Sequence, residues 1–119
     1  MNIEVFRNYC LQKKGVEESF PFGETTLVFK VMGKMFALSG LDTIECEANL
    51  KCDPDWAVEL REAHPDDILP GYHMNKKHWN TVKCERSLDD TFLRKLIDHS
   101  YELVVSSLPK KTREELARL

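Results

Sequence analysis

The sequence predicts an α+β fold of two layers: a mainly antiparallel sheet with helices packed on one face, an N-terminal helix and a long C-terminal helix. Apolar residues recur at three- and four-residue spacing near both ends of the chain, over residues 2–14 and 87–108, as in amphipathic helices. Between them, short β-rich runs alternate at a two-residue period. No internal repeat or Gly/Ser/Pro-rich linker divides the chain, so residues 1–119 are expected to form a single domain.

The first expected helix covers residues 2–14. Asn2 can cap its N-terminus, Ile3, Phe6 and Cys10 share one face, and Gly15 ends it. The segment that follows, residues 15–23, is interpreted as a loop. This helix therefore offers one apolar face to the predicted sheet.

The next two runs, residues 25–31 and 34–40, are expected to form a hairpin around Met32-Gly33. With a two-residue turn, Leu27 lies opposite Leu38 and Phe29 lies opposite Phe36. A three-residue loop that ends at Gly33 would shift this pairing by one residue. The register with the two-residue turn buries these four large apolar side chains on one face.

A third strand is expected over residues 44–51, with one face shared by Ile44, Cys46, Ala48, Leu50 and Cys52. Asp53-Pro54 then supplies the N-cap and first-turn proline of a short helix whose buried stripe is Trp56, Leu60 and Ala63. Residues 64–71 are interpreted as a loop. Residues 72–74 and 78–84 are expected to form two strand arms around Asn75-Lys76-Lys77.

Residues 87–108 contain the longest predicted helix. Ser87 and Asp90 resemble a capping box, and Asp89 suits the positive end of the helix dipole. Ser100 lies on the buried side, where a hydroxyl bonded back to a carbonyl is expected. Pro109 interrupts the helix, and Thr112 with Glu115 is interpreted as a second capping box that opens a short C-terminal helix.

Composition limits the function classes. The net charge of −3 and the pI near 5.8 lack the strongly basic balance of dedicated nucleic-acid domains, so any such role depends on a local patch. No leader-like start and no long apolar stretch is present, so a cytoplasmic protein without membrane partners is expected. The four cysteines show no C-x-x-C pair, and neither disulfides nor metal binding is expected of them. Cys46 and Cys52 are interpreted as small core residues.

Residues Gly71 to Lys83, GYHMNKKHWNTVK, hold three lysines, two histidines, two asparagines and a tryptophan without one acid. Removing them leaves 14 basic residues (17 minus 3) against 20 acidic ones. His73 and His78 on opposite arms of a hairpin could take an ion or a phosphate, but no acidic third ligand lies nearby in sequence, so no metal site is predicted. The segment is where a polyanion or a polar ligand is expected to bind.

Four stretches of the chain also resemble a known family: residues 21–38, PFGETTLVFKVMGKMFAL; residues 49–54, NLKCDP; residues 70–82, PGYHMNKKHWNTV; and residues 98–111, DHSYELVVSSLPKK. Together they resemble the MmcQ/YjbR family of small bacterial proteins. That resemblance implies a frataxin-like (CyaY-like) arrangement of sheet and helices and a "double wing" DNA-binding motif. It implies a non-enzymatic cytoplasmic protein, with matching positions at Lys30, Lys34, Asn75, Lys76, His78, Trp79 and Asn80.

The hypothesis from the sequence is weak DNA binding. Lysines neutralise phosphates, the two asparagine amides can hydrogen-bond backbone or bases, and Trp79 can stack on an exposed base. The two lysine-bearing hairpin tips are interpreted as the two wings. The predicted contact residues are Lys30, Lys34, Lys51, His73, Asn75, Lys76, Lys77, His78, Trp79 and Asn80. The alternative is a module that binds a protein or a small anion through this surface without binding DNA, and a monomer is favoured.

Motifs for catalysis are lacking. The sequence contains no Gly-rich phosphate loop, no nucleophile elbow and no H-E-x-x-H. Ser100 has no recognisable base beside it and is expected to pack in the core. No catalytic residue and no cofactor is therefore predicted, and the chain is not expected to be an enzyme.

Overall fold

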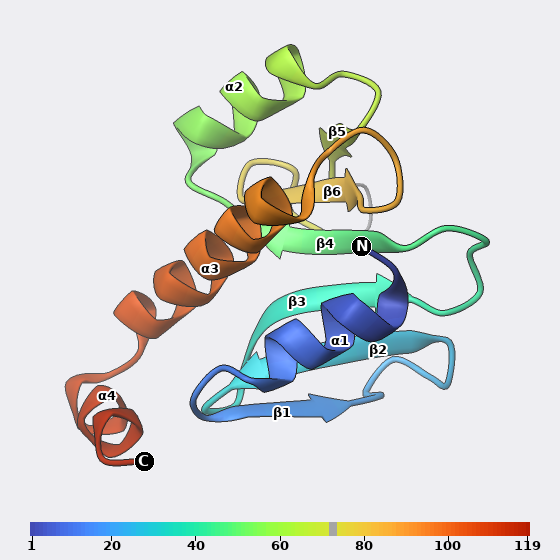
Figure 1. Cartoon of the computed structure of the whole chain (residues 1–119). Coiled ribbons are helices and arrows are strands. Elements are labelled where there is room, and N and C mark those ends of the chain that lie inside the picture. Colours follow the sequence, from blue (N-terminus) through green and yellow to red (C-terminus); the bar gives the residue numbers. More distant parts are fainter. Residues whose placement is uncertain (72–73) are drawn as a thin grey trace.

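The computed structural model describes residues 1–71 and 74–119, which form a six-stranded antiparallel sheet covered on one face by helices (Figure 1). The strands lie side by side in the order β1-β2-β3-β4-β6-β5. The elements are α1 Ile3–Leu11, β1 Val16–Ser19, β2 Thr26–Val31, β3 Lys34–Gly40, β4 Glu47–Lys51, α2 Pro54–Ala63, β5 Ile68–Pro70, β6 Trp79–Lys83, α3 Asp90–Ser107 and α4 Lys110–Ala117. The predicted α+β class, with its N-terminal and long C-terminal helices, is confirmed.

The main core lies between the helices and one face of the sheet. Phe6 of α1 meets Phe29 of β2 edge to face, with ring centroids 5.7 Å apart. The same apolar cluster includes Leu60 of α2, Leu93 of α3 and Leu116 of α4. All four helices therefore contribute to one hydrophobic core on one side of the sheet.

The predicted N-caps of α1 and α2 are observed, whereas those of α3 and α4 differ from the prediction. Asn2 Oδ1 accepts from the Val5 N–H and Asp53 Oδ2 accepts from the Trp56 N–H, as predicted. The cap of α3 is Asp89, which accepts from the Phe92 N–H, and Ser87 instead donates to Asp67. Pro109 precedes α4 without any side-chain cap, so the predicted capping boxes at residues 87–90 and 112–115 were wrong.

The β2–β3 hairpin contains the predicted two-residue turn, with Met32 at φ 48° and Gly33 at φ 87°. The predicted pairing, however, was wrong. A bulge shifts the register, so that Leu27 pairs with Ser39 and Phe29 with Ala37, while Lys30 pairs with Met35. Phe36 is the extra residue of the bulge, and its side chain is fully buried in the core. The shift by one residue that a longer loop would cause is produced here by the bulge.

Two short strands replace segments that were interpreted as loops. β1 pairs only with β2, and β5 pairs only with β6, so both are edge strands. Ile68–Pro70 is the outer partner of β6. Of the arm predicted at residues 72–74, Met74 lies in a bend, and residues 72–73 lie outside the described residues.

Two burial predictions also need correction. β4 begins at Glu47, which leaves Ile44 fully exposed, while Cys46, Ala48, Leu50 and Cys52 are buried as expected. In α2 the buried residues are Ala57 and Leu60, and Ala63 faces solvent because the helix turns its Ala57 side toward the sheet. All four cysteines are buried and free; burial raises the pKa of Cys10, and that of Cys52 to about 12.

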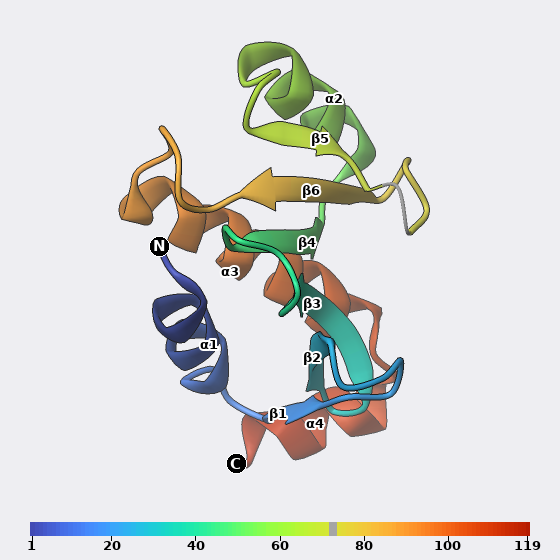
Figure 2. The ribbon, with the colours of Figure 1, turned by 90° about the vertical axis from the view of Figure 1, so that its right-hand side faces the viewer.

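The second face of the sheet carries its own small apolar cluster, Val28, Leu38 and Trp79, with Met35 and Met74 packed against it. Figure 2 shows that the β1–β2 connection and the turn at residues 74–78 before β6 both project on the side away from α1, which is this second face. We call it the open face. Within residues 1–71 and 74–119, no helix is long and apolar enough to cross a membrane.

Candidate nucleic-acid interface

The predicted lysines are brought together at one end of the sheet. β4 is antiparallel to both β3 and β6, so the end of β4 lies beside the start of each. Lys51 ends β4 and pairs with Trp79 at the start of β6, while Lys34 starts β3 next to the β2–β3 turn. Lys30, flanked by the core residues Phe29 and Val31, points to the open face. We call Lys30, Lys34, Lys51, Lys76 and Lys77 the lysine edge.

Charge pairing distinguishes these lysines from others. Lys30, Lys34, Lys51 and Lys77 take part in no ion pair within the described part of the chain, whereas Lys13 pairs with Asp98 and Lys83 pairs with Glu47. Glu17 on β1 is the cross-strand partner of Lys30, and no ion pair joins them. Within the described residues, Lys30, Lys34, Lys51 and Lys77 therefore retain cationic charge that no ion pair neutralises.

The turn that holds Lys76 and Lys77 is organised by Asn75. Its Oδ1 accepts from the Lys77 N–H at 2.9 Å, and its carbonyl accepts from the N–H groups of His78 and Trp79. This arrangement leaves the Lys76 and Lys77 side chains exposed and His78 half-buried. Asn75 is thus a turn residue that positions the lysines, and His73 lies outside the described residues.

Trp79 does not offer a free stacking surface. Its side chain is 8% exposed and packs against Val28 and Leu38 on the open face. Base stacking requires an exposed ring face, so the predicted stacking role does not fit this geometry. Trp79 instead fixes the start of β6 on the sheet.

Asn80 faces the opposite side of the sheet and is buried among the helices. Its Oδ1 accepts from Arg61 Nη1 at 2.9 Å, and its Nδ2 donates to the Ala57 carbonyl at 3.4 Å. Only 2% of the residue is exposed, so its amide is committed to holding α2 against β6. The prediction that Asn80 hydrogen-bonds to DNA does not fit this position.

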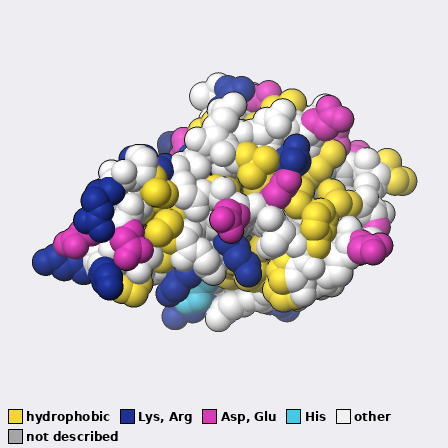
Figure 3. Space-filling view, turned by 90° about the horizontal axis from the view of Figure 1, so that it is seen from below, with side chains coloured by type: hydrophobic (Ala, Val, Ile, Leu, Met, Phe, Trp, Pro, Cys, Tyr) yellow, Lys and Arg dark blue, Asp and Glu magenta, His cyan; other side chains and the backbone are white. Residues whose placement is uncertain are grey.

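A further group of cations near this end was missed in the sequence. Leu116 of α4 and Met32 of the β2–β3 turn both lie against Gly15, which places α4 next to the hairpin. Lys110, Lys111 and Arg113 are exposed and unpaired within the described residues. Figure 3 shows Lys and Arg side chains gathered at the end of the molecule where α4 lies. The run KKTR at residues 110–113 is the sequence signal that could have identified these cations.

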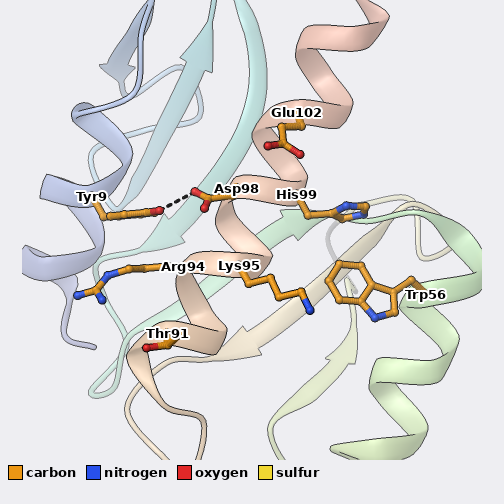
Figure 4. Close-up of a pocket in the computed structure, with 8 residues that line it drawn as sticks. All are labelled: Tyr9, Trp56, Thr91, Arg94, Lys95, Asp98, His99 and Glu102. Atoms are coloured by element: carbon orange, nitrogen blue, oxygen red, sulfur yellow. Dashed lines mark hydrogen bonds between the residues drawn. The ribbon is translucent and has the colours of Figure 1, made fainter.

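A hollow of about 550 Å³ lies over the outer face of α3, between Tyr9 of α1 and Trp56 of α2 (Figure 4). Asp98 accepts hydrogen bonds from Tyr9 Oη and Lys13 Nζ, and burial with this bond raises the pKa of Tyr9 to about 12. Arg94 and Lys95 extend toward opposite walls, each 5.8 Å from a ring centroid. These contacts bind the three helices together, and no predicted site residue lies among them.

His99 joins α3 to the start of α2. Its Nε2 accepts from the Asp53 N–H at 3.1 Å, its ring meets the Trp56 ring edge to face at 4.6 Å, and burial lowers its pKa. The unfolded chain therefore binds more protons than the folded chain over a window just below the ordinary histidine pKa of about 6.5. Stability contributed by neutral His99 is complete above that value and is lost as the pH falls through the lower folded-state pKa.

The expected result is a urea-unfolding midpoint that decreases between pH 7.5 and pH 5.5, with a smaller decrease in His99→Gln. His78→Gln removes a histidine from the surface turn and should keep the His99-dependent part of the slope. Equal slopes in the wild type and His99→Gln would show that this hydrogen bond does not couple folding to protonation.

The described side chains give little support for metal binding. Within the described ranges, no group of three or more His, Cys, Asp or Glu residues is placed to hold an ion. The proposed pairing of His73 with His78 falls partly outside these residues.

A sequence model of the YjbR family matches residues 11–103, which is most of the chain. The chain belongs to the YjbR family. Over all 119 residues it is 34% identical to the "uncharacterized protein YjbR" of Escherichia coli K12, and both chains are covered completely. It is 38% identical over 113 residues to the "uncharacterized protein YbdF" of Escherichia coli O157:H7, covering 95% of this chain and 92% of the relative.

Solved structures give the same fold. The Deinococcus radiodurans protein DR2400, described as a DUF419 domain, superposes with a TM-score of 0.92 at 39% identity, over 98% of this chain and 88% of that one. A Pseudomonas syringae protein superposes with a TM-score of 0.71 at 27% identity, over 87% of this chain and 98% of that one. The resemblance to the YjbR family seen in the sequence is thus confirmed, and the names of these relatives state no activity.

Proposed function

We propose that this YjbR-family protein is a non-enzymatic DNA-binding protein whose contact surface is the lysine edge. The observation that carries the proposal is the convergence of lysines from β2, β3, β4 and the turn before β6 at one end of the sheet, four of them without an ion pair in the described residues. Unpaired lysines bind phosphates and release counterions, which gives an affinity that depends strongly on salt.

The geometry favours contacts to phosphates over readout of bases. Trp79 and Asn80, which would stack on or hydrogen-bond to bases, are both committed to the protein interior. Phosphate contacts position a protein on DNA without reading its sequence. Binding is therefore expected to be weak and nearly independent of DNA sequence.

The spacing of the lysines suits a duplex. β2 and β4 lie on either side of β3, so Lys30 and Lys51 are separated by about two strand spacings, roughly 10 Å. The grooves of B-DNA are about 6 and 12 Å wide, and phosphates line both sides of each groove. Lysines from the hairpin and from the turn at residues 75–77 are thus on the scale needed to reach both edges of one groove.

The test is fluorescence anisotropy with a mixed-sequence duplex at several salt concentrations. If all five lysines reach phosphates, the log-log slope with salt is about −4 to −5. Lys34→Glu/Lys77→Glu is expected to lower the affinity at low salt at least tenfold and to reduce the slope by about 2. Thermal unfolding should remain close to that of the wild type, because both side chains are exposed.

The matched control is Arg94→Glu/Lys95→Glu, which makes the same change in charge on the helix side. It should bind DNA nearly as well as the wild type. An equal loss of DNA affinity in both double variants would mean that binding depends on the net charge of the protein and not on the lysine edge. No binding of the wild type at low salt would refute the proposal and leave an acidic protein or a small anion as the partner of the lysine edge.

A further inference from the structure

A hollow of about 450 Å³ lies on the open face, at the end of the sheet away from the lysine edge. Thr26 at the start of β2, Gly40 at the end of β3 and Asn49 of β4 form its floor. Its walls come from three connections: Phe22 between β1 and β2, Asp42 and Thr43 between β3 and β4, and Met74 between β5 and β6. We call this hollow the open-face groove. Its volume is within the range of small-molecule sites.

Gly40 is what allows the floor to be open. It alternates with Leu38 along β3 and pairs with Thr26, so a side chain at this position would enter the groove. A Cβ built on Gly40 would come 3.2 Å from Asp42 Oδ1. The Asp42 carboxylate therefore lies over the floor, in the space that a side chain at residue 40 would use.

The lining is rich in acceptors and negative in charge. Among the described residues, it includes the carboxylates of Asp42 and Glu47 and no lysine, arginine or histidine. Glu47 is paired with Lys83, but Asp42 takes part in no ion pair in the part of the chain described. Asn49 Oδ1 accepts from Thr81 Oγ1, which holds this amide at the edge of the floor. Among the described lining residues, Asp42 is thus the carboxylate without an ion pair.

Apolar surface faces this charge. Phe22 is 64% exposed at the rim, and Leu38 and Met74 line the same hollow. Small-molecule sites are lined mainly by apolar and aromatic side chains, with a few polar groups that fix the orientation of the ligand. A phenyl ring also attracts a cation placed over its face. The groove therefore offers an acceptor for a cation together with an apolar wall.

We propose that the open-face groove binds a small organic cation, with an ammonium group paired to Asp42 and an apolar body held between Phe22 and Met74. The site is independent of the lysine edge: the open face carries cations at one end and this acidic groove at the other. Anionic ligands, including DNA phosphates, are disfavoured in the groove by the same charge.

The test is an amide-resolved NMR titration with three ring compounds that differ in charge: benzylamine, benzyl alcohol and benzoate, at pH 7. Benzylamine should give saturable shifts at Thr26, Gly40, Asp42 and Asn49. Benzyl alcohol should bind at least fivefold more weakly and benzoate should cause no saturable shift. Equal affinity for benzylamine and benzoate would overturn the proposal.

Two variants locate the binding. Asp42→Asn is nearly isosteric and should lower the affinity for benzylamine at least fivefold. Phe22→Ala should lower the same affinity as well. Asp66→Asn removes an exposed carboxylate from the loop before β5, outside the groove, and should leave the affinity unchanged. Both groove variants change exposed residues, and melting temperatures near that of the wild type would show that they fold. Unaltered affinity in Asp42→Asn would refute the assignment of the cation partner.

Discussion

Replacing Ser100 with alanine is expected to lower the free energy of unfolding by about 2–4 kcal/mol, because the buried Phe36 carbonyl and the partly buried Lys51 N–H both lose this partner. Ser100 Oγ donates to the Phe36 carbonyl at 2.5 Å and accepts from the Lys51 N–H at 2.9 Å. Pairing between β3 and β4 stops at Ala37 and Leu50, one residue earlier. The Ser100 hydroxyl of α3 therefore bridges β3 and β4 one residue beyond the end of their pairing.

Urea unfolding monitored by circular dichroism measures this loss. Ser106→Ala is the matched control: Ser106 lies on the same helix, is exposed, and bonds only to the Leu103 carbonyl one turn earlier. Ser106→Ala should change the free energy of unfolding by no more than about 0.5 kcal/mol. A loss of under 1 kcal/mol in Ser100→Ala would mean that water or a closer approach of the strands replaces the hydroxyl.

Ser100 also shows how far the sequence predicts a contact. Its place on the buried side of a long helix follows from the three- and four-residue period, and that prediction was correct. The expected acceptor was a carbonyl of the same helix, whereas the observed partners are strands 64 and 49 residues away. These partners are distant in sequence and meet Ser100 only once α3 packs on the sheet, so no local pattern around residue 100 indicates them.

The edge strands were missed for a related reason. β1 reads Val-Glu-Glu-Ser, and β5 has only three residues and ends in Pro70. Edge strands have one neighbour and less to bury, so they lack the regular apolar alternation of β2 and β3. The sheet order and its six strands therefore required the structure, although the fold class did not.

The candidate site, too, could be predicted only in part from the sequence. Exposed lysines at turns were predictable, because turn residues and charge are local properties of the sequence. The burial of Trp79 and Asn80 was not, since it depends on both faces of β6 being covered: the open face by the side chains of Val28 and Leu38, and the other by α2. The string HWN looks like a binding motif in sequence, and two of its three residues serve packing instead.

Asn80→Ala is the second change with a large expected effect, a loss of about 2–3 kcal/mol in the free energy of unfolding. It leaves the Ala57 carbonyl without its side-chain donor and removes the acceptor of Arg61 in a position that is 2% exposed. Asn8→Ala, the same substitution at an exposed position of α1, should change stability by less than about 0.5 kcal/mol.

DNA binding separates the structural role of Asn80 from the role suggested by the sequence. Measured well below its melting temperature, Asn80→Ala should keep the wild-type affinity for a duplex, because the lysine edge is unchanged and the amide does not reach the surface. Reduced DNA affinity with unchanged stability would reverse this interpretation and return Asn80 to the contact surface. The two measurements on one variant thus decide whether this part of the polar segment at residues 71–83 holds α2 in place or binds the ligand.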